Sequence, residues 1–138
     1  MKKTREEIIE ELLAEHPIES MIQFSEIDVR EKLEKNEFLV VKYTELLNSE
    51  KETLERILAI KDKIIGIQYD HYRFNYQKQL KSAEIEKYYL PKDEKIIKIN
   101  KILRKQKWRV EFFETATKAL IRLGWNMKSY LQAIKMGL

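Results

Sequence analysis

Residues 94–123 read EKIIKINKILRKQKWRVEFFETATKALIRL, a run without glycine or proline. Lysine and isoleucine dominate its first half, and lysine is a good helix former. Asp93 precedes the run in the place of an N-cap, and Gly124 follows it in the place of the residue after a helix end. The stretch therefore predicts a long helix from about Glu94 to Leu123. Its apolar positions at helical spacing are Ile96, Ile99, Leu103 and Val110.

The rest of the chain favours the same structure. Only 3 Gly and 2 Pro occur in 138 residues, so we expect few sharp turns and an all-α fold of long helices. Isoleucines around Gly66 also suit a strand, but helix is favoured because flanking breakers are missing. The first predicted element is a helix over 4–15, capped by Thr4 and ended by His16-Pro17, and a connector at 18–24 follows it. Next come a helix over 27–47, a turn at Asn48-Ser49 and a long helix from about Glu50 to Lys81. One helical turn at Glu84–Tyr88 within Ser82–Leu90 precedes the helix at 94–123, and a last helix over Met127–Lys135 is capped by Asn126.

A chain of this length is about one domain long. We expect a single all-helical domain over residues 1–138, in which 1–48 form acidic N-terminal helices and 49–138 form the basic binding and assembly helices. The charges are sorted accordingly. Residues 1–57 carry 9 Lys and Arg against 15 Asp and Glu, a net charge of −6, whereas residues 58–138 carry 18 against 8, a net charge of +10. A basic surface suits a polyanion, and an acidic one suits basic or mixed partners.

Several functional classes lack their residues. Cysteine is absent, so disulfides, thiolate metal sites and cysteine nucleophiles are excluded. His16 and His71 do not have metal-ligand spacing, and no glycine-rich phosphate-binding loop occurs. The few serines and threonines have no recognisable base partner. We therefore expect no enzyme activity, no cofactor and no metal. No run of about 18 apolar residues predicts a membrane span.

Residues 68–81, QYDHYRFNYQKQLK, interleave aromatic rings with cations. Single-stranded nucleic acid requires this combination, because bases stack on rings at about 1–3 kcal/mol each and phosphates attract Lys or Arg. An equally open interpretation is that half of the rings lie in the core or at a subunit interface.

A row of cations follows on the predicted helix at 94–123. Lys95, Lys98, Lys101, Lys105 and Arg109 fall within an arc of roughly 120° on one helix face. Like charges in a row repel one another, and a phosphate backbone would explain them through counterion release. The alternative is a solvated face that acidic residues of another helix or subunit neutralise in part.

The C-terminal third has more apolar residues than one helix stripe needs. Apolar side chains surround the helix on most sides, so it must be buried on most sides. In so short a chain, we expect other subunits to cover it. The predicted oligomer interface comprises Trp108, Phe112, Phe113, Leu120, Trp125, Leu131 and Ile134.

The segment from Glu84 to Gly137 resembles the UvsY-type recombination mediators of T4-like bacteriophages. The resemblance is carried by the run EIEKYYLPKDEKIIKINKILRK, by Phe112 and by the segment RLGWNMK at Arg122–Lys128, in matching order and spacing. It extends more loosely to Lys42-Tyr43 and His71-Tyr72, so that it covers most of the chain. Each motif consists of common aliphatic and charged residues and is weakly specific by itself. The order and spacing of the motifs together carry the resemblance to the family.

The resemblance implies a helical homo-oligomeric ring that binds single-stranded DNA without sequence preference. It also implies contact with a RecA-like recombinase, which is loaded onto DNA covered by a single-strand DNA-binding protein, in the cytoplasm of an infected bacterial host cell. The family's basic residues ahead of its aromatic pair are absent here, where Gly66 and Gln68 stand, and its glycine after that pair is also missing. Lys61, Lys63, Arg73 and Lys78 would replace those cations.

The expected functions are therefore three. The first is a recombination mediator that contacts single-stranded DNA. The second is a structural or scaffold helical oligomer without DNA-binding activity, and the third is a regulator that binds duplex DNA. The residues expected to contact DNA are Lys61, Lys63, Tyr69, Tyr72, Arg73, Tyr76, Lys78, Lys98, Lys105 and Arg109.

Overall fold

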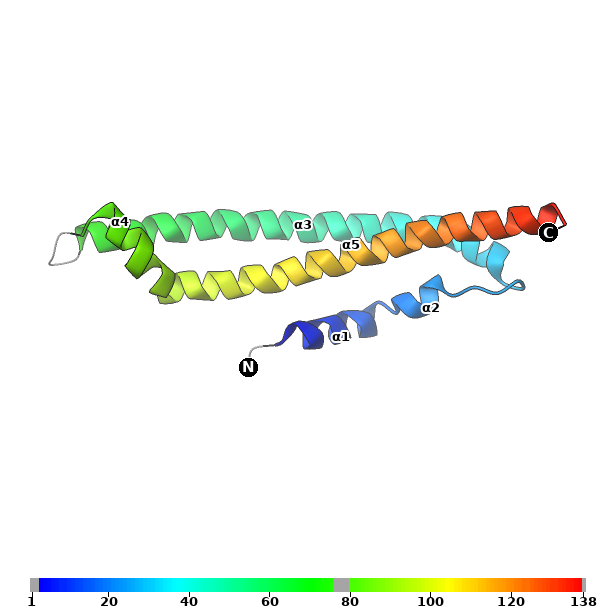
Figure 1. The fold of residues 1–138 in the computed structure, drawn as a ribbon, viewed down its shortest axis with the longest axis horizontal. Coiled ribbons are helices and arrows are strands. Elements are labelled where there is room, and N and C mark those ends of the chain that lie inside the picture. The colour runs from blue at the N-terminus through cyan, green and yellow to red at the C-terminus, as the bar shows by residue number, and fades with distance from the viewer. Residues whose placement is uncertain (1–2, 76–79, 138) are drawn as a thin grey trace. The chain divides into compact units, whose positions relative to one another are not determined.

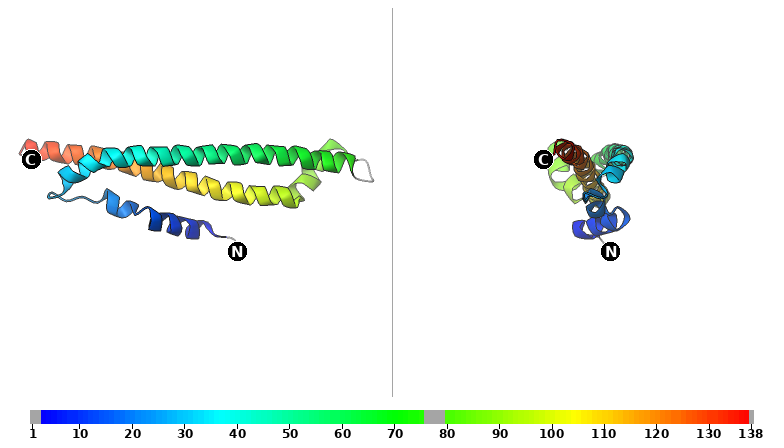
Figure 2. Two further views of the ribbon diagram at one scale, coloured as in Figure 1. Left: turned by 180° about the vertical axis from the view of Figure 1, so that it is seen from behind. Right: turned by 90° about the vertical axis from the view of Figure 1, so that its right-hand side faces the viewer.

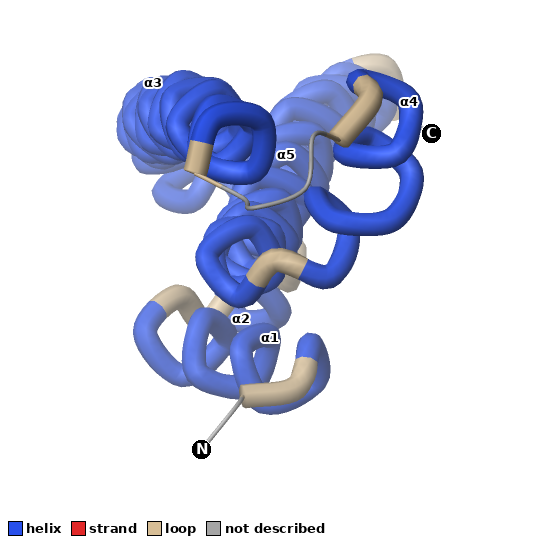
Figure 3. The backbone as a smooth tube through the Cα atoms, turned by 90° about the vertical axis from the view of Figure 1, so that its left-hand side faces the viewer, coloured by secondary structure: helices blue, strands red, loops and turns tan. Residues whose placement is uncertain are grey.

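A computed structural model describes residues 3–75 and 80–137 (Figure 1). The prediction of an all-α fold is confirmed, because these residues contain only helix, turn and loop (Figure 3). The elements are α1 (Arg5–Glu15), α2 (Ile18–Ile22), α3 (Val29–Phe74), α4 (Ser82–Glu84), a π-helical turn (Ile85–Tyr89), a 3-10 turn (Leu90–Lys92) and α5 (Glu94–Lys135). Within the described residues, no helix has both the length and the apolarity that crossing a bilayer demands.

The chain divides into two compact units. The first unit is formed by Met1–Lys51 together with Trp108–Leu138, and the second unit is Glu52–Lys107. Each unit takes part of α3 and part of α5.

In the first unit, α1 lies alongside the second half of α5 (Figures 1 and 2). Thr4 caps α1 as predicted, because its hydroxyl accepts a hydrogen bond from the Glu7 amide at 3.2 Å. His16 ends α1, also as predicted, because the following proline disfavours helical backbone. The expected connector at 18–24 differs, since five of its residues form α2. Val29 begins α3 just after Asp28, which accepts a hydrogen bond from the Ser25 amide.

The core of the first unit joins α1, α3 and α5. Tyr43 and Phe113 are 0% and 1% exposed, and their rings lie 6.3 Å apart. His16 packs against both rings and shares a hydrogen bond of 3.0 Å with the Tyr43 hydroxyl. Desolvation in this core raises the pKa of Tyr43. A second cluster closes the far end of α5, where Val29, Leu123 and Met127 are buried together beside Phe24, Leu33, Tyr130 and Leu131.

The predicted break at Gly124 is wrong, because α5 continues through it to Lys135. A Cβ atom on Gly124 would lie 2.5 Å from Oδ1 of Asn36. Asn36 is 4% exposed and donates a hydrogen bond of 2.9 Å to the Leu120 carbonyl. The glycine therefore permits close approach of α3 to α5, and it does not end a helix.

The predicted turn at Asn48-Ser49 is also wrong, since α3 runs through both residues from Val29 to Phe74. Both side chains are exposed on the helix surface. Asparagine and serine favour caps, but their cost inside a helix is only about 0.7 kcal/mol or less, so packing on either side decides the outcome. The predicted helix end at Lys81 is wrong as well, because α3 ends at Phe74 and residues 80 and 81 are not helical. Gly66 lies within α3, as expected for a helix.

In the second unit, α3 packs on the first turns of α5. Ile96, Ile99 and Leu103 are each 6% exposed, which confirms the predicted buried stripe. Ile85 and Leu80 complete this core from the connecting segment, where Ile85 is 0% exposed. The predicted helical turn at Glu84–Tyr88 is present, with α-helical, π-helical and 3-10 parts between Ser82 and Lys92.

Candidate nucleic-acid interface

The second unit is the basic part of the molecule. Residues 52–107 carry 14 Lys and Arg against 8 Asp and Glu, a net charge of +6, whereas the first unit carries 13 against 15, a net charge of −2. Within the first unit, three ion pairs join residues of its N-terminal part to α5. Arg5 pairs with Glu111, Lys51 with Glu114 and Arg109 with Glu50.

Asp93 organises the turn that joins the helices of the second unit. It is 5% exposed, and its carboxylate accepts hydrogen bonds at 2.6 Å from Tyr72 and from Gln68. Its other oxygen accepts the amides of Lys95 and Ile96 at 2.9 and 3.1 Å, which confirms Asp93 as the cap of α5. Burial acts to raise the pKa of Asp93, but these four hydrogen bonds outweigh it and lower the pKa below its ordinary value.

Two of the tyrosines expected to contact DNA are held in this turn. The Tyr72 hydroxyl binds Asp93, and the Tyr72 ring lies 5.4 Å from the ring of Tyr89. The Tyr69 hydroxyl lies 2.6 Å from that of Ser82. Both rings are half-buried, so their first role is to position the turn. Tyr76 and Lys78, which were also expected to contact DNA, lie outside the described residues.

Among the described residues of the second unit, Phe74 and Tyr88 are large exposed rings, at 68% and 55% exposure. Each has a cation on its ring. The Arg73 guanidinium carbon lies 5.3 Å from the centre of Phe74, and the Lys87 ammonium lies 5.4 Å from the centre of Tyr88. The sequence predicted Arg73 as a DNA contact and placed Phe74 among the interleaved rings of residues 68–81, but Phe74, Tyr88 and Lys87 were not among the expected contacts. The adjacent pairs Arg-Phe and Lys-Tyr were a signal, but helical periodicity could not show that Phe74 is exposed at the end of α3 or that Tyr88 is exposed in the π-helical turn.

Two open hollows accompany these pairs. One of about 620 Å³ is lined by Arg73, Phe74, Leu80, Lys81 and Ser82. Another of about 410 Å³ is lined by Tyr72, Glu84, Tyr88, Tyr89 and Lys92. Both combine a ring with a lysine or arginine at the same end of the unit. A planar base on the ring and a phosphate on the cation are the ligands that this combination fits.

The row of cations on α5 is divided between the two units. Lys95 and Lys98 are exposed and Lys105 is half-buried, and none of the three has a carboxylate at ion-pair distance among the described residues. Arg109 differs, because its guanidinium donates to both carboxylate oxygens of Glu50 at 2.7 to 3.1 Å. Those hydrogen bonds raise the pKa of Arg109 further. This cation is therefore engaged within its own unit.

The remaining expected contacts lie on α3. Lys63 is exposed and Lys61 is half-buried. Neither lysine has an ion-pair partner in the described part of the chain. Both lysines add positive charge to the second unit, but they lie away from Phe74 and its cation. Arg73 stands ten positions after Lys63, which is about 15 Å along an α-helix.

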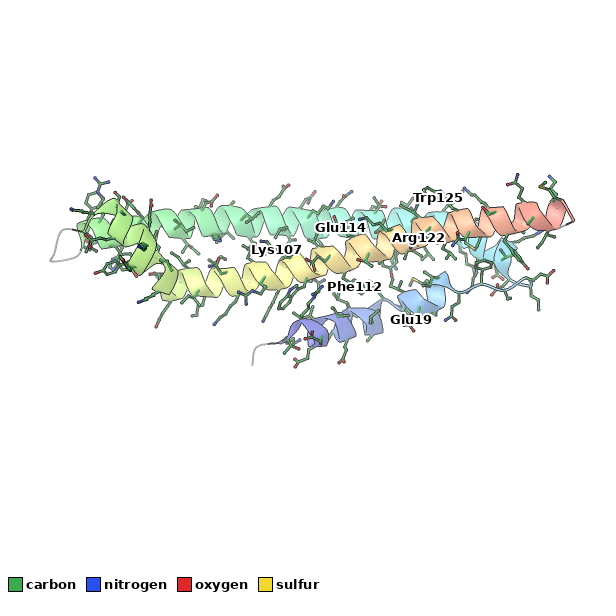
Figure 4. The ribbon with its side chains drawn as sticks, viewed as in Figure 1. Glu19, Lys107, Phe112, Glu114, Arg122 and Trp125 are labelled. Carbon is green, nitrogen blue, oxygen red and sulfur yellow. The ribbon has the colours of Figure 1, made fainter. Side chains whose placement is uncertain are left out.

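The residues expected at an oligomer interface have unequal exposure. Phe113 and Leu120 are 1% and 0% exposed, so the chain's own helices already bury them without another subunit. Phe113 packs against Tyr43 of α3 and against His16 at the end of α1, and the Leu120 carbonyl accepts a hydrogen bond from Asn36 of α3. Trp108, Phe112 and Leu131 are half-buried, whereas Trp125 and Ile134 are 67% and 40% exposed. Figure 4 shows Phe112 on the side of α5 that faces α1, and Trp125 on another side.

No group of three or more His, Asp or Glu side chains in residues 3–75 and 80–137 could hold a metal ion. No protein-family model, characterised protein or solved structure matches this chain. The resemblance to recombination mediators therefore stays a prediction from the sequence. The proposed function is based on the geometry of the second unit.

Proposed function

We propose that this chain binds single-stranded DNA without sequence preference through the basic second unit. The observation that carries the proposal is the pair of exposed rings, Phe74 and Tyr88, each in contact with a cation in a unit of net charge +6. A ring offers a stacking surface to any base, and the cations attract the phosphates, so neither contact depends on sequence.

Single strands are favoured over duplex DNA by the same features. The bases of a duplex are already stacked, so their faces are closed to Phe74 and Tyr88. Direct duplex reading needs polar side chains on an element that enters the major groove, whereas the exposed faces of Phe74 and Tyr88 can stack only on an unpaired base. Salt should weaken binding, because each neutralised phosphate releases counterions.

We further propose that the protein acts as a recombination mediator, on the basis of the UvsY-type resemblance. In this role several copies form a ring, and each copy contributes one weak DNA-binding site. Because the sites are held together, the ring binds one strand with a higher affinity than a single copy does. The assembly would help a RecA-like recombinase to load onto strands covered by single-strand DNA-binding protein, in the cytoplasm of an infected bacterial cell. The exposed Trp125 and Ile134 support an assembly through the C-terminal part of α5.

The stacking contacts are tested by titrating a fluorescently labelled single-stranded oligonucleotide with ring variants. Phe74→Leu and Tyr88→Leu remove a stacking surface worth about 1–3 kcal/mol, which is about a 5- to 150-fold loss of affinity for each site. Phe74→Tyr keeps the ring and should retain binding. Unchanged affinity in both leucine variants would place the DNA elsewhere.

The charge contribution needs a matched control. Lys98→Glu changes an exposed lysine of the second unit, and Lys35→Glu makes the same change on the first unit. Lys98→Glu should weaken binding more than Lys35→Glu at low salt. Absence of single-strand binding in the wild-type protein at low salt, with helical content intact, would favour the structural oligomer without DNA-binding activity.

A further inference from the structure

Two apolar patches of opposite charge lie on the first unit. The first is on α3, where Phe38 and Val41 are 80% and 57% exposed. Residues three apart are neighbours on a helix surface, so the two side chains form one patch. The exposed carboxylates of Glu34, Glu37 and Glu45 lie three or four positions from one of them.

The carboxylates of this acidic apolar patch have no lysine or arginine at ion-pair distance among the described residues. Two lysines lie near Phe38 along the helix: Lys35, three positions before it, and Lys42, four positions after it, whose ammonium lies over the Tyr43 ring. Glu31, seven positions before Phe38, is already paired with Lys35 at 2.8 Å. The patch therefore presents two apolar side chains with a surplus of negative charge.

The second patch is on α5, where Trp125 and Ile121 are 67% and 37% exposed and stand four residues apart. The exposed cations Lys118, Arg122 and Lys128 lie three positions from one of them. Figure 4 shows Arg122 and Trp125 on this stretch of α5, with Trp125 directed away from α1. These three cations also have no carboxylate at ion-pair distance in the part of the chain that the structure describes. Glu114, one turn before Lys118, is paired with Lys51.

We infer that the acidic apolar patch of one copy binds the basic apolar patch of a second copy. Each patch has one aromatic and one aliphatic side chain, and three unpaired charges of one sign face three of the other. Aromatic anchors surrounded by charges are typical of the centre and rim of protein interfaces. A second copy is the occupant because the chain itself carries both complementary surfaces.

The contact joins unlike surfaces, so each copy keeps one patch of each kind available for the next copy. Such a head-to-tail interface closes into a ring or extends as a filament, whereas an interface between like surfaces stops at a dimer. This inference rests on the proposed assembly of several copies and names the surfaces that build it. It does not depend on DNA binding, because both patches belong to the first unit.

Charge reversal tests the pairing in the absence of DNA. One variant carries Glu34→Lys, Glu37→Lys and Glu45→Lys, and the other carries Lys118→Glu, Arg122→Glu and Lys128→Glu. Each variant alone would oppose like charges in every contact, so sedimentation should show self-association at least about tenfold weaker than that of the wild type. Mixed in equal amounts, the two variants can pair at both contacts and should assemble as alternating copies.

Two controls make the result decisive. Glu10→Lys, Glu26→Lys and Glu55→Lys make the same change of net charge at exposed positions outside both patches, and this control variant should assemble as the wild type does. A variant with all six reversals should assemble alone, which shows that neither set prevents folding. Wild-type assembly by either triple variant alone, or no recovery in both the mixture and the six-fold variant, would overturn the inference. Loss of oligonucleotide binding with assembly intact would instead count against the proposed function.

Discussion

Replacing Gly124 with alanine should destabilise the protein, although alanine is the better helix former. Inside a helix, the Gly→Ala change alone is worth about 1 kcal/mol in favour of folding. The structure opposes this gain, because the new Cβ would lie 2.5 Å from Oδ1 and 3.5 Å from Cγ of Asn36. Asn36 must therefore move, or α3 and α5 must separate.

Either adjustment costs more than the propensity gains. Moving Asn36 breaks its buried hydrogen bond to the Leu120 carbonyl, which costs about 1–3 kcal/mol. Forcing an extra methyl group into a packed contact costs about 1–3 kcal/mol more when the neighbours cannot relax. After the propensity gain is subtracted, we expect Gly124→Ala to lower the free energy of unfolding by about 1–5 kcal/mol.

Urea denaturation followed by circular dichroism measures this effect, and Gly66 supplies the matched control. No heavy atom lies within 4 Å of a Cβ built on Gly66, so Gly66→Ala should raise the stability by up to about 1 kcal/mol. In an Asn36→Ala background the obstacle is absent, and Gly124→Ala should become neutral or favourable. If Gly124→Ala stabilises the wild-type protein as much as Gly66→Ala does, the close approach of α3 and α5 is refuted.

Three further predictions follow from the described contacts. Asp93→Asn should lower the free energy of unfolding by about 1–3 kcal/mol at neutral pH. Because the pKa of Asp93 is lowered in the folded state, the stabilisation by its carboxylate is present above the ordinary carboxyl pKa and is lost as the pH falls. The variant should therefore lose less stability in acid than the wild type. Tyr43→Phe keeps the buried ring but removes the hydrogen bond with His16, and thermal unfolding should show a loss of about 0.5–1.5 kcal/mol; an unchanged midpoint would contradict the bond. Arg109→Gln should reduce stability by about 1 kcal/mol by removing the fork to Glu50, while single-strand affinity falls less than in Lys98→Glu; the reverse order of affinities would place Arg109 at the DNA.

Local sequence signals predicted the starts of α1 and α5, but the starts expected at about Glu50 and at Met127 lie inside longer helices. Thr4 and Asp93 cap α1 and α5 as expected, because a cap depends on residues only a few positions apart. The stripe of Ile96, Ile99 and Leu103 was likewise readable from periodicity, and all three are buried.

The errors came from contacts between residues that are distant in sequence. Gly124 has the sequence signal of a helix end, but its role is set by Asn36, which lies 88 positions earlier in the chain. Phe113 packs against Tyr43 and His16, which lie outside α5, so no pattern within α5 could reveal that cover. The same limit applies to the candidate site, where Tyr72 is held by Asp93 while the rings left exposed are Phe74 and Tyr88.

The central claim is that the second unit binds unpaired DNA through exposed rings and unpaired cations. The most direct test measures the affinity of the wild-type protein for one labelled oligonucleotide, single-stranded and annealed to its complement, over a series of salt concentrations. We predict tighter binding of the single strand at every salt concentration, and a linear fall of log K with log salt with a slope of about −0.7 for each phosphate contacted. Equal affinity for the duplex, or a single-strand affinity that does not change with salt, would contradict the account.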